Sequence, residues 1–225
     1  MSAGADPMQS LYPFLYADTS DLDSVLEQVR ASTVAKAIEV ADLRRVIAER
    51  DGARLAECAR QAANRFAAGG RLFAFGNGGS ATDAQQLATL FLSEGLPAFA
   101  LGNDTAVVTA LCNDIGVEVM FARQLAALSI SGGSGTHDIA VGLSTSGNSD
   151  NLLRAFDEAS RRGMLTIGLA GYDGGKMAEL AGGDKHSIDY LFVAPSTSIH
   201  RIQEAQTTIY QVLWELTCAS AFPVR

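Results

Sequence analysis

Apolar residues recur along this chain in two alternating patterns, one typical of buried strands and one typical of amphipathic helices. Short apolar runs predict strands at 71–75, 96–100, 137–143, 164–169 and 188–193. Apolar positions at three- and four-residue steps predict helices at 81–92, 105–111, 117–127, 150–162, 176–180 and 198–220. Such alternation favours the α/β class, in which helices cover both faces of a parallel sheet.

The region before the first predicted strand has a helical period. Leu22, Val25 and Val29 follow helical steps, the period shifts near 32–33, and residues 21–50 therefore predict one long helix or two. A further helix is expected from Gly52 to Ala68, ended by two glycines. Leading helices with an apolar stripe often pack in a bundle or across a subunit boundary, so we expect a homo-oligomer.

The first twenty residues have no sustained period, although they contain several large apolar side chains. We interpret residues 1–20 as an N-terminal extension and residues 21–225 as one domain that begins with a helical region. The length of 225 residues suits a single domain with a sizeable core.

Charge and cysteine content narrow the class of partner. The chain has 17 basic and 25 acidic residues and no basic cluster, which argues against direct binding of nucleic acid. Its three cysteines are far apart in apolar surroundings, which favours reduced thiols in a cytoplasmic protein. We expect neither export nor membrane insertion, because no basic start precedes an apolar run and no long apolar stretch occurs.

A hydroxyl-rich turn follows the strand predicted at 137–143 and precedes a helix. Its hydroxyls come from Ser144, Thr145, Ser146 and Ser149, and the start of the helix adds unpaired N–H groups and partial positive charge. Gly147 lets the backbone approach closely or take a positive φ. This pattern predicts a binding site for a phosphate ester, and the alternative is an ordinary turn that caps a helix.

A glycine-rich turn at 76–80 follows the strand predicted at 71–75 in the same way. Its spacing does not fit the dinucleotide fingerprint, and the Gly-Lys pair of a Walker loop is absent. Both turns follow strands, and ligands of open α/β sheets bind beyond the carboxyl ends of strands. We therefore expect one ligand site that uses both turns.

Four motifs together carry a resemblance to a known family. They lie at 75–85, 144–149, 171–177 and 201–204. In the same order they resemble the sugar isomerase (SIS) domain family, in the branch of phosphoheptose isomerase (sedoheptulose 7-phosphate isomerase) and the DnaA initiator-associating protein. The resemblance covers about 42–222. It implies a five-stranded parallel sheet of flavodoxin-like order and a homotetramer with ligand sites at subunit boundaries.

The resemblance also implies roles for individual residues. The phosphate of a sugar phosphate would be held by Ser144, Thr145, Ser146 and Ser149. The sugar would be lined by Asn77, Gly78 and Ser80, with Gln203 as a further contact.

The catalytic positions of the family are altered in this chain. The isomerases have a His and a Glu four residues apart after the glycine-rich loop, and a Gln and a His eight apart on the last helix, which serve metal binding and proton transfer. The corresponding positions hold Gln86, Leu90, Gln203 and Gln211. Glutamine does not titrate near neutrality and leucine has no polar side-chain atom, so we expect no metal and no other cofactor.

Two functions follow from these residues. The first is a non-catalytic sugar-phosphate binder that regulates a protein partner. The second is an isomerase with a modified active site that uses His200, or a residue of a neighbouring chain, as its base. The alternative interpretation of His200 is a histidine at a helix start or at an interface.

Overall fold

The computed structural model describes residues 22–129, 137–183 and 186–221. Contacts divide the chain into two units, residues 1–41 and 42–225. The predicted extension at 1–20 lies outside the described residues. The division at 20 and 21 therefore stays a prediction.

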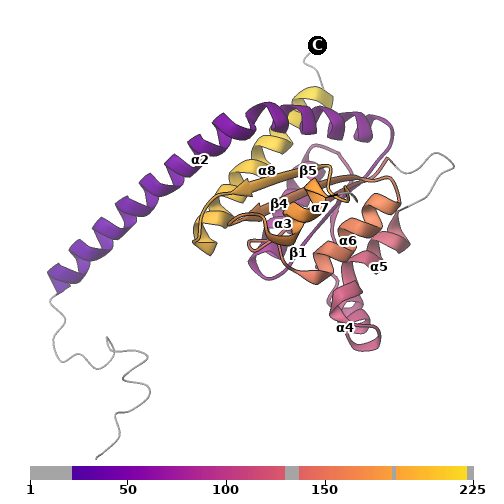
Figure 1. Ribbon diagram of the computed structural model, residues 1–225, viewed down its shortest axis with the longest axis horizontal. Helices are drawn as coiled ribbons and strands as arrows, with labels where there is room; N and C mark the ends of the chain where they lie inside the picture. The colour runs from indigo at the N-terminus through magenta and orange to yellow at the C-terminus, as the bar shows by residue number, and fades with distance from the viewer. Residues whose placement is uncertain (1–21, 130–136, 184–185, 222–225) are drawn as a thin grey trace, which may run out of the picture. The chain divides into compact units, whose positions relative to one another are not determined.

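The core of residues 42–225 is a five-stranded, fully parallel sheet, as the sequence predicts (Figure 1). Its strands are β1 (Leu72–Gly76), β2 (Ala98–Ala100), β3 (Ile139–Leu143), β4 (Leu165–Gly171) and β5 (Tyr190–Ala194). The order β2-β1-β3-β4-β5 is the flavodoxin-like order that the resemblance implies. Chain progression reverses between β1 and β3, which makes this pair the topological switch point.

Helices account for most of the remaining described residues. They are α2 (Leu22–Ala67), α3 (Gly79–Ser93), α4 (Thr105–Asp114), the 3-10 turn η2 (Val117–Val119), α5 (Met120–Leu128), α6 (Asp150–Arg161), α7 (Gly175–Gly182) and α8 (Ile199–Ala221). Among the described helices, none combines the length and apolar character needed to cross a membrane.

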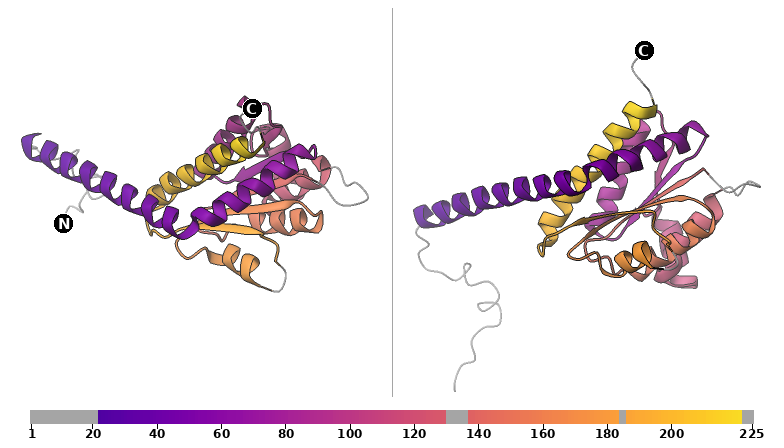
Figure 2. Two further views of the ribbon diagram at one scale, coloured as in Figure 1. Left: turned by 90° about the horizontal axis from the view of Figure 1, so that it is seen from above. Right: turned by 45° about the horizontal axis from the view of Figure 1, so that its top comes forward.

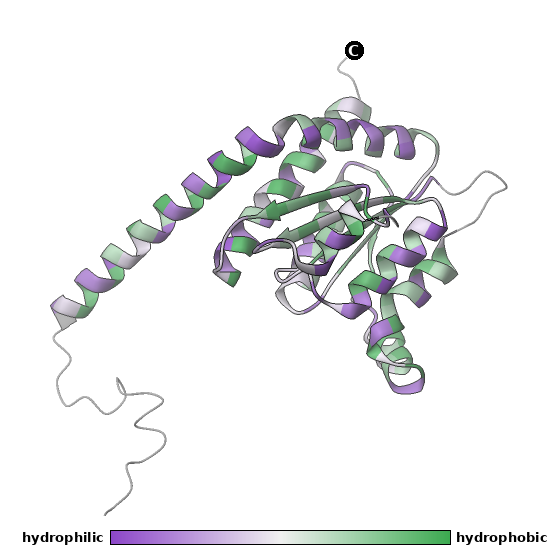
Figure 3. Cartoon of the chain, in the orientation of Figure 1, coloured by the Kyte–Doolittle hydropathy of each residue, from purple (hydrophilic) through white to green (hydrophobic). Residues whose placement is uncertain are grey.

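The two faces of the sheet pack against different helices. Strand side chains alternate, so Leu72 and Ala74 join one apolar cluster while Phe73 and Phe75 join the other. The first cluster includes residues of α2, α3 and α8, and the second includes residues of α5, α6 and α7. Figure 2 shows helices on both sides of the sheet, and Figure 3 shows that the strands are largely apolar.

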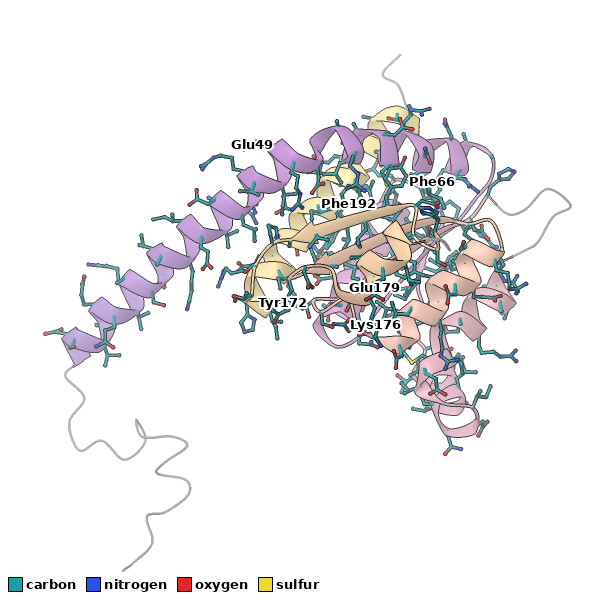
Figure 4. The ribbon with its side chains drawn as sticks, viewed as in Figure 1. Glu49, Phe66, Tyr172, Lys176, Glu179 and Phe192 are labelled. Carbon is teal, nitrogen blue, oxygen red and sulfur yellow. The ribbon has the colours of Figure 1, made fainter. Side chains whose placement is uncertain are left out.

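The second half of α2 is part of the first cluster. Phe66 of α2 and Phe192 of β5, both labelled in Figure 4, belong to it. The guanidinium of Arg54 lies over the Phe192 ring, 5.4 Å from its centroid. Cys58 is a buried free thiol here, and burial raises its pKa, which fits the prediction of reduced core cysteines.

The sequence-based helix boundaries were wrong in two places. The expected start of a new helix at Gly52 is absent, because α2 continues through it as one helix. Glycine inside a helix costs about 1 kcal/mol relative to alanine, and the buried side chains of Leu55 and Ala59 on the same helix outweigh this cost. The helix predicted at 117–127 begins instead as the turn η2, and α5 starts at Met120.

The N-terminal unit is described from Leu22 onward, and several large apolar side chains of α2 are exposed there. They are Val25, Leu26, Val29, Val34 and Ile38. At about 100° per residue the first three lie on one side of the helix and the last two on another, in agreement with the shift of period predicted near 32–33. Packing of these side chains against another chain stays a prediction.

Candidate functional site

The sheet register places the two predicted turns side by side. Gly76, the last residue of β1, pairs with Leu143, the last residue of β3. Leu143 also pairs with Leu169 of β4. The glycine-rich turn (76–80), the hydroxyl-rich turn (144–149, here called the socket) and the turn after β4 therefore leave the same edge of the sheet, at its switch point.

Hydrogen bonds within the socket leave hydroxyl protons available to a ligand. Ser144 Oγ accepts the Gly147 N–H at 3.0 Å, and Ser146 Oγ accepts the Asn148 N–H at 3.3 Å. Each hydroxyl uses a lone pair in this bond and keeps its own proton to donate. Ser149 precedes α6 without capping it through its side chain, and its Oγ forms a 3.5 Å hydrogen bond with Ser144 Oγ, in which one of the two hydroxyls donates and the other keeps its proton. The result is a cluster of neutral donors beside a helix N-terminus.

The socket is fixed against the turn that precedes α7. Gly147 has φ 67°, and a Cβ there would lie 2.0 Å from the Gly174 carbonyl oxygen. The Met177 N–H donates to the Gly147 carbonyl, and the Lys176 N–H donates to Asn148 Oδ1, both at 3.0 Å. Lys176, labelled in Figure 4, places its ammonium 3.6 Å from Asp150, and both side chains are exposed. The third motif of the resemblance therefore supports the socket.

The glycine-rich turn is joined to the socket side by a pair of amides. Asn77 and Asn151 exchange two hydrogen bonds, of 3.0 and 2.9 Å, so each amide keeps one N–H and one lone pair for a ligand. Gly78 has φ 57°, and Ser80 is buried at the start of α3. A cavity of about 570 Å³ opens here, lined by Asn77, Val117, Glu118, Ser149, Asp150, Asn151 and Arg154.

Helix α8 brings two glutamines to the same edge. A Cβ added to Gly79 would lie 2.2 Å from Gln203 Nε2, so the Gln203 amide lies against the glycine-rich turn. Its contact with a sugar stays a prediction. Gln206 is fully buried, and its Nε2 donates to the Ser144 carbonyl at 3.3 Å. Its Oε1 has no hydrogen-bond partner among the described residues. Sequence reasoning missed Gln206, for which the available signal was a polar residue next to Ala205 on the apolar side of the helix.

The positions that the resemblance assigns to catalysis lie on α3 and α8. Leu90 packs against the first apolar cluster, and Gln211 is half-buried. Gln86 is exposed, and its Oε1 accepts the hydroxyl of buried Tyr210 at 2.9 Å. The same hydroxyl lies 3.4 Å from Asp83 Oδ1. Burial raises the pKa of Asp83 and of Tyr210.

The predicted base, His200, lies in the first turn of α8 and is exposed. It precedes Gln203 by three positions, which is close to one helical turn. Arg201 and Glu204 of the fourth motif form an ion pair with each other. A catalytic role of His200 stays a prediction.

Together, these features define a class: an open α/β protein with a candidate phosphate-ester site at the switch point of its sheet. The comparisons with known proteins agree. Residues 37–171 match the family described as the SIS domain. The chain therefore belongs to the SIS domain family.

Its relatives include several proteins named phosphoheptose isomerase. The one from Aquifex aeolicus (strain VF5) is 42% identical over 154 residues, 66% of this chain and 74% of the relative. That from Aneurinibacillus thermoaerophilus is 38% identical over 184 residues, 79% of this chain and 87% of the relative. The structure of phosphoheptose isomerase GmhA from Neisseria gonorrhoeae has a TM-score of 0.72 and 34% identity, covering 84% of this chain and 97% of that one.

Proposed function

We propose that this chain binds a sugar phosphate at the socket and interconverts its ketose and aldose forms through a modified active site. The seven-carbon phosphosugars are the first substrate class to test, because relatives at about 40% identity are named phosphoheptose isomerase. The observation that carries the proposal is the socket, in which the Ser144 and Ser146 oxygens accept backbone N–H groups and so do not use their own protons in these bonds.

Isomerisation through an enediol requires a base and a group that polarises the carbonyl. His200 is the candidate base within the chain, and a residue of a neighbouring chain is the alternative. The expected homo-oligomer, a tetramer by the resemblance, belongs to the same proposal, since a neighbouring chain would then border the site. A cytoplasmic location fits a phosphorylated metabolite as substrate.

The second candidate is a non-catalytic binder that regulates a protein partner. The specific observation in its favour is the identity of Gln86, Leu90 and Gln211, none of which can transfer a proton near neutrality. Gln86 and Leu90 are also engaged elsewhere, with Tyr210 and with the apolar core. Under this candidate function, the chain binds a sugar phosphate at the socket and does not isomerise it.

One experiment separates the candidates. Purified full-length protein is incubated with sedoheptulose 7-phosphate, with and without added zinc, and aldose formation is followed while binding is measured by calorimetry. Turnover that is lost in His200→Ala supports the isomerase. Binding without turnover supports the regulator, and absence of both contradicts the sugar-phosphate site itself.

A matched control protects this assay from a contaminating isomerase. The Ser144→Ala, Ser146→Ala double variant is purified in the same way. Turnover that persists in it does not come from this chain.

A further inference from the structure

A polar cluster lies between α3 and α8, one to two helical turns beyond the glycine-rich turn. It consists of Asp83 and Gln86 on α3 and of Thr207 and Tyr210 on α8, here called the α3–α8 seam. Tyr210 is fully buried with its ring in the first apolar cluster, whereas Gln86 is exposed. The outer side of the Gln86 amide is therefore the side that a ligand can reach.

The seam has fewer hydroxyl protons than acceptors. Tyr210 has one proton, and it faces Gln86 Oε1 at 2.9 Å and Asp83 Oδ1 at 3.4 Å. Thr207 is the other hydroxyl beside Asp83, and its proton has a second acceptor in the Gln203 carbonyl at 3.0 Å. Two hydroxyl protons thus face three acceptors, so Gln86 and Asp83 compete for the proton of Tyr210.

Two arrangements satisfy every group. In the first, Asp83 carries a proton and donates it to the Tyr210 oxygen, while Tyr210 donates to Gln86 Oε1, so the Gln86 N–H groups point outward. In the second, Asp83 is ionised and accepts from Tyr210, and the Gln86 amide turns over to donate to the Tyr210 oxygen. Its own oxygen then points outward.

We propose that Tyr210 is a positioning residue that couples the orientation of the Gln86 amide to the protonation of Asp83. The site then presents N–H donors to a ligand when Asp83 is protonated and an acceptor oxygen when it is ionised. The ligand-facing part of this inference rests on the proposed function. The coupling within the protein does not.

The surroundings of Asp83 support this coupling. Within the described residues, the groups that act on its carboxyl are Tyr210 and Thr207 of α8. The strands packed against α3 are β1, β2 and β3, and their side chains are all apolar. Burial raises the pKa of Asp83, which brings its titration closer to the working range.

The position of Gln86 indicates which part of a ligand it would meet. Gln86 follows Gly79 by seven residues, about 10 Å along α3. An open-chain sugar phosphate of six or seven carbons spans such a length when its phosphate lies in the socket. The outward N–H groups of Gln86 would then bind an oxygen at the far end of the sugar, a carbonyl or a hydroxyl.

The first test needs no ligand. In labelled full-length protein, the side-chain amide resonance of Gln86 is identified by its loss in Gln86→Met and followed from about pH 4 to about pH 8, with the carboxyl carbon of Asp83. The expected result is one shared midpoint in the wild type, and an amide resonance that no longer follows Asp83 in Tyr210→Phe. The proposal is overturned if the Gln86 amide resonance does not shift with the Asp83 titration in the wild type. It is also overturned if that resonance shifts to the same extent in Tyr210→Phe.

The second test uses sedoheptulose 7-phosphate as the probe, at a pH of about 8, where its phosphate is fully ionised. Asp83→Asn imitates the protonated acid, because the amide donates to Tyr210. We expect about three- to tenfold tighter binding, the effect of one added hydrogen bond. The gain should vanish when Tyr210→Phe is added and persist with Tyr190→Phe, a control on β5.

The two tests fail in different ways. A wild-type protein that does not bind the probe contradicts the proposed function, while the coupled titration can still be present. Equal gains from Asp83→Asn with and without Tyr210→Phe contradict the positioning role, even if the probe binds.

Discussion

The socket lies beyond the carboxyl ends of the strands and the α3–α8 seam lies one to two helical turns along α3, and the resemblance relates the two regions differently to the family. In the socket, Ser144, Thr145, Ser146 and Ser149 all match the phosphate-binding motif that the resemblance implies. Along α3 and α8, the resemblance implies four catalytic positions, of which three hold Gln86, Leu90 and Gln211 and one holds the expected Gln203. We therefore propose that binding residues and reaction residues have diverged separately.

The physical reason is that the socket depends on backbone contacts, whereas the seam depends on helix side chains. The socket is fixed by backbone contacts, such as the hydrogen bond from the Met177 N–H to the Gly147 carbonyl, and a Cβ at Gly147 would lie 2.0 Å from the Gly174 carbonyl oxygen. In the seam, Tyr210 is buried, whereas Gln86 is exposed on α3, where a side chain can change without moving the backbone. Gln86 accepts the hydroxyl of Tyr210 there. We therefore expect a substitution at Gln86 to leave the fold intact.

The largest expected effect comes from rebuilding the family's catalytic set. The triple variant Gln86→His, Leu90→Glu, Gln211→His restores nitrogen and carboxylate ligands for zinc and a titrating base. We expect zinc-dependent conversion of sedoheptulose 7-phosphate to rise about 10²- to 10⁴-fold over the wild type, the usual contribution of general acid–base catalysis. Aldose formation with and without a chelator measures it.

Stability must be followed in the same variant, because Leu90 packs against the apolar core. Urea unfolding reports the cost of placing a carboxylate there, and the double variant without Leu90→Glu is the control. A folded triple variant that binds zinc but gains no turnover would show that residues 86, 90 and 211 alone do not account for the missing activity.

Removal of two socket hydroxyls tests whether the socket binds the phosphate. Ser144→Ala with Ser146→Ala deletes two donors to a charged phosphate, each worth about 1.5–3 kcal/mol, and we expect at least a hundredfold weaker binding of sedoheptulose 7-phosphate by calorimetry. Ser198→Ala is the control, since it also removes a serine hydroxyl but lies outside the socket, just before α8. Unchanged affinity in a folded double variant would place the phosphate elsewhere.

Much of this comparison was visible in the sequence, because strand periods and turn residues are local signals. The adjacency of the turns at Gly76 and Leu143 followed from the sheet order that the resemblance implies. The continuity of α2 through Gly52 was missed because a local helix breaker is outweighed by packing along the rest of the helix. The bonds of Gln206 and Tyr210 depend on how α8 packs against its neighbours, which no local pattern encodes.

The backbone of the socket gives a smaller effect. Gly147→Ala adds a Cβ 2.0 Å from the Gly174 carbonyl oxygen at a residue with φ 67°, so the turn must shift. We expect about 2 kcal/mol lower free energy of unfolding from strain and displacement, measured in urea. Gly182→Ala is the control, because nothing lies within 4 Å of a Cβ there. Equal stability of the two variants would mean that the socket tolerates movement.

The smallest effect concerns the titration of Asp83 in the seam. Burial raises the pKa of its carboxyl above the ordinary value of an aspartic acid, although Tyr210 and Thr207 act in the opposite direction. The folded protein therefore holds this proton more tightly than the unfolded chain, and stability falls as pH rises from the unfolded pKa through the folded one. Asp83→Asn cannot ionise, so its free energy of unfolding relative to the wild type should increase across that window and then level off. Unfolding curves of both proteins at matched pH measure the difference, and a variant that loses stability relative to the wild type as pH rises would show that the ionised carboxylate is the favoured form in the fold.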